Sequence, residues 1–525
     1  MKEVIVRTNF NEKIGLGHLF RTKALVKNFK EKNFKITFAL DNEIQNKKLL
    51  NYNYFNLYSP KEKFISQSKD AFILKKKIQG KNIKYIIVDD YRLNKNWEKH
   101  FYNKGIKLIV FEDVNDRKHL CDFIIDSRPI KYEILEKKYT KLLPKKCKKL
   151  LGPKFSIVNS NFKNKNNKSS KLNILFYFGG GGNFKNYYNL IYSFSSTVKN
   201  SKLSHKININ IVIWPLAKNY QDIKILSKKN KFIKIIHNKL NLSPILEKTS
   251  LFFGTASSIV NELNYLKIPA CLFSTSKNQN QNLKYRENFG QYLFFEKNEL
   301  IKSDLIANLI ITLINNFVRI KNLCNEKTFQ VDKYGAKRII NEITGSKSVL
   351  KKNIGKFQKD KKKNGIFPVS DNLINEYLYS RNLIKNRKNS VNTNLINKIE
   401  HYIWWFTTKK KSFYLLRDGK IRLFLSQELT QFKNKKFWLG GWFNAKDQCT
   451  VLDIMKALKW QLKYSKKQKN STWIVLIKKS NKIVFKINKY LGYKIISPKN
   501  NKIEYQAIKS FYKIKNPANF YFLKK

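Results

Sequence analysis

Short runs of apolar residues alternate with helical patterns at the start of the chain. Four apolar runs lie at residues 4–6, 36–40, 85–88 and 108–111. The residues from 18 to 30, after the first run, have the spacing of a helix. Apolar runs separated by helices are typical of a parallel sheet with crossover connections. The pattern therefore predicts a Rossmann-like domain over residues 1–158.

The same alternation begins again after a polar stretch rich in Asn, Lys and Ser at residues 159–171. The second set of apolar runs lies at residues 172–178, 209–213, 250–253 and 269–273. A further helix is expected to begin near Ser257. We place a domain boundary in the polar stretch and predict a second Rossmann-like domain over residues 171–345, so that two α/β halves face each other.

A lysine-heavy segment with little periodicity follows the second half. It includes Lys359-Asp360-Lys361-Lys362-Lys363. This composition indicates an interdomain linker over residues 346–367. The remaining residues, 368–525, are then a third domain. A chain of 525 residues is longer than one hydrophobic core usually supports, which agrees with several domains.

The net charge of +70 does not by itself indicate a nucleic-acid-binding protein. Dense Lys and Arg supplies affinity for phosphate. Here, however, the basic residues are spread along the whole length, and no zinc-finger, RRM or KH pattern accompanies them. Apolar residues make up 42% of the chain, enough for folded cores. We expect no nucleic-acid partner, although the charge would attract an anionic substrate.

The cysteines and the N-terminus indicate the cellular compartment. The five cysteines are scattered and include no CxxC pair, which argues against a zinc site and a disulfide framework. The run at residues 4–6 follows the first residues directly, with no hydrophobic signal-peptide region, and no segment has about eighteen uninterrupted apolar residues. We expect a cytoplasmic protein without membrane insertion.

A glycine loop with a histidine joins the first expected strand to the first expected helix. Its sequence is Ile14-Gly15-Leu16-Gly17-His18. Glycines let a backbone approach a ligand, and a helix N-terminus offers N–H groups to an anion. The simpler alternative is a tight turn with His18 as a helix cap. Because open α/β sheets carry their sites at the carboxyl ends of strands, we favour His18 as a base that takes a proton from water.

Two further constellations follow expected strands of the second half. Phe178-Gly179-Gly180-Gly181-Gly182-Asn183 is costly to order, so we favour a backbone approach to phosphate or sugar over a plain linker. Gly254-Thr255-Ala256-Ser257-Ser258 precedes Glu262, and Asn278-Gln279 lie beyond the next strand. Small hydroxyl residues at a helix start bind phosphate or cap the helix, and Glu262 grips a ribose diol or forms a capping pair. The residues alone leave these alternatives open.

The order of these motifs resembles one known family. In chain order they are Arg7, Ile14-Gly15-Leu16-Gly17-His18, Arg21, Asp89 with Tyr91, Asp113, Cys121-Asp122, Leu151-Gly152-Pro153, Gly179-Gly180, Ser257-Ser258 with Glu262, and Asn278-Gln279. This order resembles the pseudaminic-acid-pathway UDP-sugar hydrolases, which cleave UDP from 2,4-diacetamido-2,4,6-trideoxy-β-L-altropyranose and are similar in fold to GT-B glycosyltransferases. The resemblance covers residues 1–340.

The resemblance implies a role for each matched position. His18 corresponds to the catalytic base that activates water for attack at the anomeric carbon. The substrate would contact Arg7, Asn9, Gly15, Gly17, Arg21, Asp89 and Tyr91. The nucleotide would contact Gly179, Gly180, Gly181, Ser257, Ser258, Glu262, Asn278 and Gln279. No metal or other cofactor is implied for hydrolysis, and the adjacent pair Asp89-Asp90 at a strand end is expected to point its side chains apart.

The chain departs from the family at two positions, which leaves the exact sugar open. The family usually has Asp where this chain has Asn9, and an acidic residue is common where Gly182 stands. Two other functions use the same architecture: a GT-B glycosyltransferase that passes the sugar to an acceptor, and a non-catalytic scaffold that binds a nucleotide sugar. For the hydrolase, the implied partners are the UDP-sugar and other enzymes of the sugar-nucleotide pathway.

The tail resembles GNAT N-acetyltransferases. His401-Tyr402-Ile403-Trp404 lies in an expected helix before a turn at Asp418-Gly419. Asn481 lies one helix before Leu491-Gly492-Tyr493. This order implies an α+β domain with acetyl-CoA as cofactor, acting on the 4-amino group of the UDP-sugar; the alternative is an α+β domain whose aromatics only pack. Residues 443–450 contain no glycine loop to hold the CoA diphosphate, which argues against acetyl transfer.

The whole chain is therefore expected to be α/β. Two Rossmann-like domains in a GT-B arrangement would be followed by an α+β GNAT-like domain. The first domain would carry the catalytic base, and the second would bind UDP.

Overall fold

The structure is a computed structural model that describes the chain in two compact units, Met1–Gln358 and Lys359–Lys525. It describes residues 1–525 apart from residues 12–13, 42–48, 60, 159–161, 163–169, 180, 215, 238, 240, 347–363, 447–448, 467, 469 and 515. Each unit has its own hydrophobic cores.

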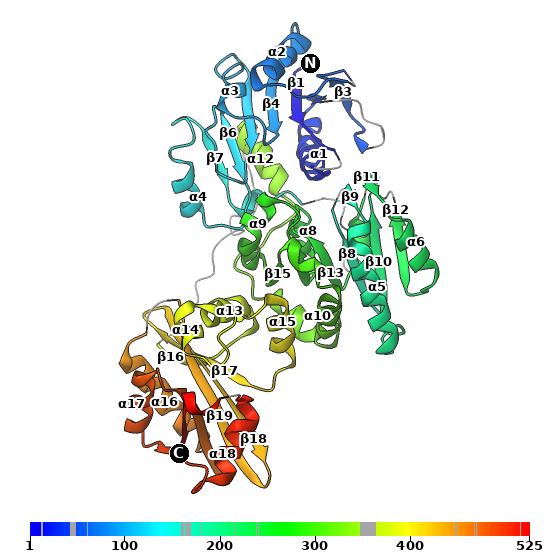
Figure 1. Ribbon diagram of the computed structural model, residues 1–525. Helices are drawn as coiled ribbons and strands as arrows, with labels where there is room; N and C mark the ends of the chain where they lie inside the picture. The colour runs from blue at the N-terminus through cyan, green and yellow to red at the C-terminus, as the bar shows by residue number, and fades with distance from the viewer. Residues whose placement is uncertain are drawn as a thin grey trace. The chain divides into compact units, whose positions relative to one another are not determined.

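The first half of unit Met1–Gln358 is a seven-stranded parallel sheet with helices packed on it (Figure 1). Its strands are β1 (Glu3–Thr8), β2 (Lys35–Leu40), β3 (Asn53–Asn56), β4 (Ile83–Asp89), β5 (Lys107–Phe111), β6 (Phe123–Asp126) and β7 (Lys148–Leu151). Its helices are α1 (Gly17–Lys30), α2 (Gln67–Ile78), α3 (Lys95–Glu98) and α4 (Tyr132–Tyr139). The strand order is β3-β2-β1-β4-β5-β6-β7.

Helices on both faces explain why the strands of this sheet are apolar along their whole length. Val4 and Val6 of β1 share a core with Phe29 of α1. Ile5, between them, points to the opposite face and shares a core with Leu74 of α2. Alternate residues of β1 are therefore buried in two different cores.

The second half repeats this architecture with a six-stranded parallel sheet. Its strands are β8 (Leu172–Tyr177), β10 (Ile207–Ile213), β12 (Ile233–His237), β13 (Leu251–Thr255), β14 (Ala270–Phe273) and β15 (Leu293–Phe295), and β9 (Gly181–Asn183) pairs separately with β11 (Leu216–Lys218). Its helices are α5 (Lys185–Asn200), α6 (Gln221–Lys228), α7 (Ser243–Leu246), α8 (Val260–Leu266), α9 (Lys277–Leu283), α10 (Ser303–Asn315) and α11 (Phe317–Leu323), with the 3-10 helices η3 (Lys284–Phe289) and η4 (Lys297–Ile301). The order β12-β10-β8-β13-β14-β15 matches that of the first half. The helix expected near Ser257 begins at Val260, because the intervening residues form a turn.

Helix α12 (Gly335–Thr344) carries the chain from the second half back to the first. It packs against α1 and against the 3-10 turn η2 (Pro153–Phe155). A Cβ on Gly335 would lie 1.9 Å from the carbonyl oxygen of Ser156, so the close approach requires glycine. Two Rossmann-like halves in tandem form the GT-B arrangement, and the predicted fold class of this unit is confirmed.

Unit Lys359–Lys525 is an α+β domain with a mixed seven-stranded sheet (Figure 1). Its strands are β16 (Gly365–Pro368), β17 (Lys411–Arg417), β18 (Lys420–Phe432), β19 (Lys435–Asn444), β20 (Ser471–Lys478), β21 (Lys494–Ile495) and β22 (Phe520–Lys524). Its helices are α13 (Ile374–Asn382), α14 (Ile384–Lys388), α15 (Lys398–Thr407), α16 (Val451–Ser465), α17 (Lys482–Tyr490) and α18 (Lys502–Tyr512), with the 3-10 turns η5 (Asp371–Leu373) and η6 (Pro517–Asn519). The order is β16-β17-β18-β19-β20-β22-β21, and β19 and β20 are parallel. The predicted α+β class of the tail is confirmed.

The predicted linker at residues 346–367 extends too far toward the tail. Most of it, residues 347–363, lies outside the described residues. Strand β16, however, begins at Gly365 and pairs antiparallel with β17. Four residues next to a lysine-rich stretch give no periodic pattern, and this strand is specified by its pairing with β17.

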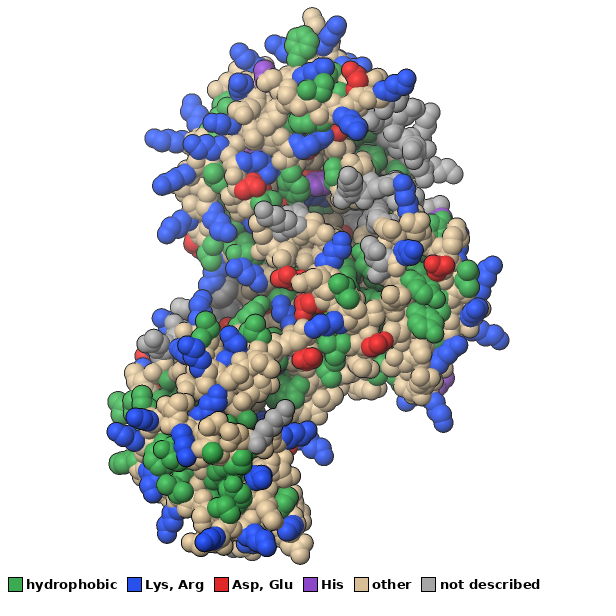
Figure 2. Space-filling view, in the orientation of Figure 1, with side chains coloured by type: hydrophobic (Ala, Val, Ile, Leu, Met, Phe, Trp, Pro, Cys, Tyr) green, Lys and Arg blue, Asp and Glu red, His purple; other side chains and the backbone are tan. Residues whose placement is uncertain are grey.

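Lysine and arginine side chains are spread over the visible face of the molecule and do not gather over one element (Figure 2). This distribution agrees with the even spread of charge along the sequence. In the described part of the chain, no single helix is long and apolar enough to cross a membrane; α10 and α11 meet that criterion only as a pair bent by 88°. Most apolar residues of α10 are buried within the second half.

Candidate active site

The carboxyl ends of β1 and β4 meet where the strand order of the first sheet reverses. The chain runs from β1 outward through β2 and β3, and then crosses to β4 on the other side of β1. Open α/β sheets bind ligands at such switch points. His18, near the start of α1, and Asp89, the last residue of β4, both lie there.

His18 and Asp89 form the central contact of the site. Nδ1 of His18 lies 2.5 Å from Oδ1 of Asp89. Because an ionised carboxylate only accepts hydrogen bonds, Nδ1 carries the proton and Nε2 is left as the basic nitrogen. The Asp89 side chain is 1% exposed and the His18 side chain is 12% exposed, so solvent reaches the imidazole and not the carboxylate.

Arg21 holds Asp89 from the next turn of α1. Its Nε and Nη2 each lie 2.5 Å from one oxygen of Asp89, which makes a bidentate pair. Burial by itself raises the pKa of Asp89, but the charges of Arg21 and His18 outweigh burial and bring the pKa down to about 2. Asp89 is therefore ionised at neutral pH and keeps the His18 ring in one orientation.

Tyr91 and Asp113 extend this cluster toward the end of β5. The Tyr91 hydroxyl donates to Oδ1 of Asp113 at 2.5 Å, and Nη1 of Arg21 donates to Oδ2 at 3.2 Å. The Tyr91 ring meets the His18 ring edge-on, with ring centroids 4.8 Å apart. Burial and the Asp113 charge raise the pKa of Tyr91, so its hydroxyl stays protonated.

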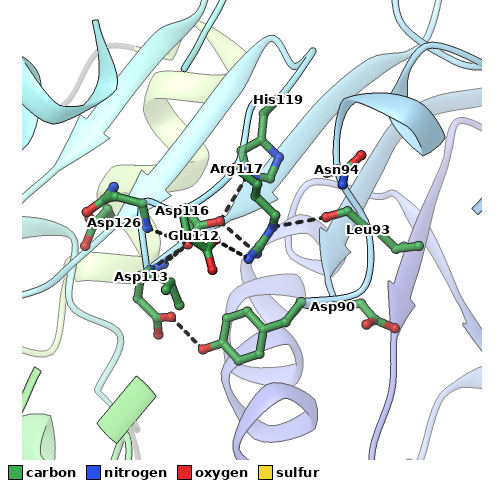
Figure 3. Close-up of polar contacts among 12 residues, drawn as sticks. Asp90, Leu93, Asn94, Glu112, Asp113, Asp116, Arg117, His119 and Asp126 are labelled. Carbon is green, nitrogen blue, oxygen red and sulfur yellow. Dashed lines mark hydrogen bonds and ion pairs between the residues drawn. The ribbon is translucent and has the colours of Figure 1, made fainter. Parts of the chain in front are cut away.

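A buried network centred on Glu112 holds the loop that carries Asp113. Oε1 of Glu112 accepts the backbone N–H groups of residues 113–115. Its Oε2 lies 2.7 Å from Nη2 of Arg117 and 3.0 Å from Nε2 of His119, and both side chains point toward Glu112 in Figure 3. Nδ1 of His119 lies 2.7 Å from Glu98. Burial lowers the pKa of His119, but hydrogen bonds and charges of the two carboxylates raise it to about 9, so His119 is a cation at neutral pH.

Arg7, predicted to contact the substrate, is fully buried beneath the site. Its Nη2 lies 2.7 Å from Asp70 and 2.6 Å from Asp41. Nδ2 of Asn9 donates to the other oxygen of Asp41 at 2.8 Å. Arg7 therefore supports Asn9 through Asp41, and its side chain is not exposed to a ligand.

The two loop glycines differ in what they require. Gly15 has a φ of 79°, in the left-handed region that favours glycine. Gly17 begins α1, and a Cβ there would meet nothing within 4 Å. The packing of the described chain would therefore allow a side chain at position 17. Because this residue is glycine, the space next to His18 is open.

The predicted nucleotide residues follow β8 and β13, the switch-point strands of the second sheet. Gly179 has a φ of 101°, and a Cβ there would lie 3.8 Å from the Thr255 side chain. The Ser257 and Tyr177 side chains are hydrogen-bonded, and the serine after Ser257 is exposed. Burial raises the pKa of Tyr177, and Glu262 of α8 adds to the increase, which places Glu262 near the same hydroxyl. Gly179 and Ser257 therefore lie after neighbouring strands, and Glu262 of α8 lies near them.

The structure describes only some of the other residues that are predicted to bind the nucleotide. Gly180 and the side chain of Asn278 lie outside the described residues, and Gly181 begins β9. Oε1 of Gln279 accepts the backbone N–H of Thr275 at 2.9 Å and its hydroxyl at 3.0 Å. The side-chain carbonyl of Gln279 thus stabilises the turn before α9.

A contact missed by sequence reasoning joins the second half to the first beside Asp113. Nδ2 of Asn282, in α9, donates to the carbonyl oxygen of Asp113 at 2.9 Å. Its Oδ1 accepts from Nη1 of Arg128 at 3.1 Å. Helical spacing could have indicated this residue, because Asn282 follows Asn278 by four residues in the sequence.

Asp89 and Asp90 turn to different partners, as expected for neighbours at a strand end. Asp89 contacts His18 and Arg21, whereas Asp90 lies 2.5 Å from Nη2 of Arg92. Among the residues that the structure describes, no three His, Cys, Asp or Glu side chains are grouped as ligands of a metal ion.

In the tail, the parallel strands β19 and β20 pair at one end only. Lys436–Trp438 pair with Ser471–Trp473. Beyond this short register β19 continues to Asn444 and β20 to Lys478 without pairing to each other. The backbone groups of β19 and β20 beyond this register are therefore not paired between the two strands.

The start of α16 does not fit the diphosphate of acetyl-CoA. The side chain of Thr450 accepts the backbone N–H of Asp453, and the Asp453 carboxylate accepts the backbone N–H of Thr450 at 2.8 Å. Nη1 of Arg417 pairs with the same carboxylate at 2.7 Å. This helix start is already capped by the chain's own carboxylate, which opposes a second anion.

Comparisons with known proteins agree with these observations. No protein-family model matches the chain. The chain is 23% identical over 283 residues to the UDP-2,4-diacetamido-2,4,6-trideoxy-beta-L-altropyranose hydrolase of Campylobacter jejuni. The matched residues make up 53% of this chain and 93% of that protein. The resemblance predicted from the ordered motifs is thereby confirmed.

Solved structures resemble the two units separately at low identity. MurG of Acinetobacter baumannii has 12% identity and a TM-score of 0.46, over 66% of this chain and 100% of that one. A ribosomal-protein-alanine N-acetyltransferase of Brucella melitensis has 12% identity and a TM-score of 0.24, over 30% of this chain and 98% of that one.

Proposed function

We propose that unit Met1–Gln358 hydrolyses a UDP-activated diacetamido-trideoxy sugar to UDP and the free sugar, a step of nonulosonic (pseudaminic) acid biosynthesis. The observation that carries the proposal is the contact between His18 and Asp89 at the switch point of the first sheet. It supports hydrolysis because it leaves a basic nitrogen at the place where such sheets bind ligands. The similarity to the Campylobacter jejuni hydrolase supports the choice of substrate.

The proposed reaction uses His18 as the general base. Nε2 of His18 takes a proton from water, and the water oxygen forms a bond to the anomeric carbon. The bond from that carbon to the diphosphate oxygen breaks, and its electron pair leaves with UDP. Asp89 stabilises the imidazolium that forms, because its ionised carboxylate faces Nδ1.

The second half would hold the nucleotide. Gly179 and Ser257 lie at neighbouring strand ends, where backbone N–H groups and hydroxyls suit phosphate. Glu262, near the Tyr177 hydroxyl, would accept a hydrogen bond from a ribose hydroxyl. These roles follow the resemblance and the positions of the side chains, and each can be tested by substitution.

The test of hydrolysis is a reaction without an acceptor. The purified full chain is incubated with the UDP-diacetamido sugar, and free UDP and free sugar are measured. We expect both products in equal amounts, and we expect His18→Ala to lower kcat/KM by about 100- to 10,000-fold. His205→Ala is the matched control, because His205 is an exposed histidine of the same unit and should leave the rate unchanged.

Two results would contradict the proposed hydrolysis. Release of UDP only after an acceptor glycan is added would identify a glycosyltransferase of the same architecture. Tight binding of UDP without turnover in either condition would identify a nucleotide-sugar-binding scaffold.

Acetyl-CoA stays a prediction for the tail. The backbone groups of β19 and β20 that are not paired between the two strands support it, and the capped start of α16 does not. Calorimetric titration of acetyl-CoA into the full chain tests it directly. Saturable heat that is lost on adding coenzyme A in excess would support binding, and no heat would remove the acetyltransferase interpretation.

A further inference from the structure

Arg286 is a partly buried cation whose side chain donates no hydrogen bond within the described protein. It lies in η3 (Lys284–Phe289), directly after α9. Its Nε is buried and has no hydrogen-bond partner among the described residues, and no ion pair joins its guanidinium to a carboxylate there. The residue as a whole is only half-buried, so a ligand can reach part of the side chain.

The surroundings of Arg286 do not neutralise its charge. Burial lowers the pKa of Arg286 to about 10; Asp113 opposes this effect and Arg128 adds to it. Arg286 is therefore still charged at neutral pH. The Asp113 carboxylate is already bonded to the Tyr91 hydroxyl and to Arg21. A charge that is desolvated without a direct partner is costly, and an anionic ligand would offset the cost.

Arg286 also lies beside the His18 cluster, although it belongs to the second half. Asn282, four residues earlier, bonds the carbonyl oxygen of Asp113. Asp113 in turn bonds Tyr91, whose ring meets His18 edge-on. Because the charge of Asp113 acts on Arg286, an anion bound at Arg286 would lie on the side of the second half that faces this cluster.

We propose that Arg286 binds the diphosphate of the nucleotide sugar. The inference rests on the proposed function, because a UDP-sugar supplies a diphosphate between the nucleoside and the anomeric carbon. A guanidinium presents a planar fork of N–H donors that matches phosphate oxygens. When the bond to the anomeric carbon breaks, negative charge grows on the diphosphate, and Arg286 stabilises that charge.

Binding of UDP and of uridine by the full chain separates a diphosphate contact from other effects. Calorimetry should show that Arg286→Gln weakens the affinity for UDP by about 10- to 100-fold, the range of a charged hydrogen bond. The affinity for uridine should not change, since uridine lacks phosphate. Lys284→Gln is the matched control: it removes one positive charge from the same short helix at an exposed position, and UDP binding should be unaffected.

Each contrary outcome has a distinct meaning. Equal UDP affinity in wild type and Arg286→Gln would overturn the inference and leave the hydrolase proposal intact. An equal loss of UDP and uridine affinity would show that Arg286 acts through the fold, and this would also overturn the inference. A weaker UDP affinity in Lys284→Gln as well would show a general effect of positive charge, with the same consequence. A wild-type chain that does not bind UDP would overturn both proposals.

Discussion

The side chain of Asn9 is an uncharged amide, so it can lie against the Asp41 carboxylate without charge repulsion. Its Nδ2 donates to Asp41 at 2.8 Å, and Asp41 is held by Arg7 and Arg92. Asn9→Asp would place a second carboxylate against the first, and the pKa of the new group would be raised. A carboxyl with a raised pKa binds protons more tightly in the folded state, so the stability of the variant should fall as pH rises from about 4.

Urea unfolding of Asn9→Asp and wild type at pH 5 and pH 7 measures this effect. The variant should lose roughly 1–3 kcal/mol at pH 7 and less at pH 5. Asn53→Asp, the same change at an exposed strand position, is the control. A deficit of equal size at both pH values would show that the charge at position 9 is not responsible.

Single residues differ in how far the sequence could predict their place. His18 could be predicted, because a loop between a strand and a helix sets its position locally. The burial of Arg7 could not, since Arg7 is in β1 and its partner Asp70 is 63 residues away in helix α2. The unused donors of Arg286 depend on contacts between the two halves, which no local pattern encodes.

The loop after β5 depends on a charged histidine for its shape. His119 bridges Glu98 and Glu112, and Glu112 binds the backbone of residues 113–115. The pKa of His119 is raised to about 9, above its ordinary value of about 6.5 in an unfolded chain. Its contribution to stability is therefore complete below about pH 6.5 and is lost as pH rises through about 9.

His119→Gln should remove this pH dependence. Unfolding by urea between pH 6 and pH 10 should show the variant less stable than wild type by roughly 1–3 kcal/mol at pH 6, with the difference shrinking toward pH 10. His205→Gln, at an exposed position, should follow wild type throughout. A constant difference in unfolding free energy between wild type and His119→Gln across this pH range would mean that His119 stabilises the loop by packing and hydrogen bonds and not by its charge.

Whole elements were predictable where their own residues specify them. The run at residues 4–6 and the helix after it are found as β1 and α1, because both faces of the strand are buried. Strands β3 and β16 were missed. Each has four residues and lies at the edge of its sheet, so pairing with one neighbour fixes it and no apolar pattern marks it.

At the scale of the molecule, the alternation of strands and helices predicted two α/β halves, and the strand orders confirm them. The return of α12 to the first half was not predictable. It depends on a backbone contact between Gly335 and Ser156, two positions far apart in the sequence. The helix packs against α1, which carries His18 and Arg21, so it connects the second half to the element that bears the proposed base.

Gly335→Ala tests how far this contact holds the two halves together. The added Cβ would lie 1.9 Å from the carbonyl oxygen and 2.7 Å from the carbonyl carbon of Ser156, both backbone atoms that cannot rotate away. We expect a loss of about 1–3 kcal/mol in urea unfolding and a lower kcat/KM, because α1 would shift with α12. Gly441→Ala, where an added Cβ meets nothing within 4 Å, should change neither quantity. Wild-type stability in Gly335→Ala would mean that α12 moves without cost and does not position α1.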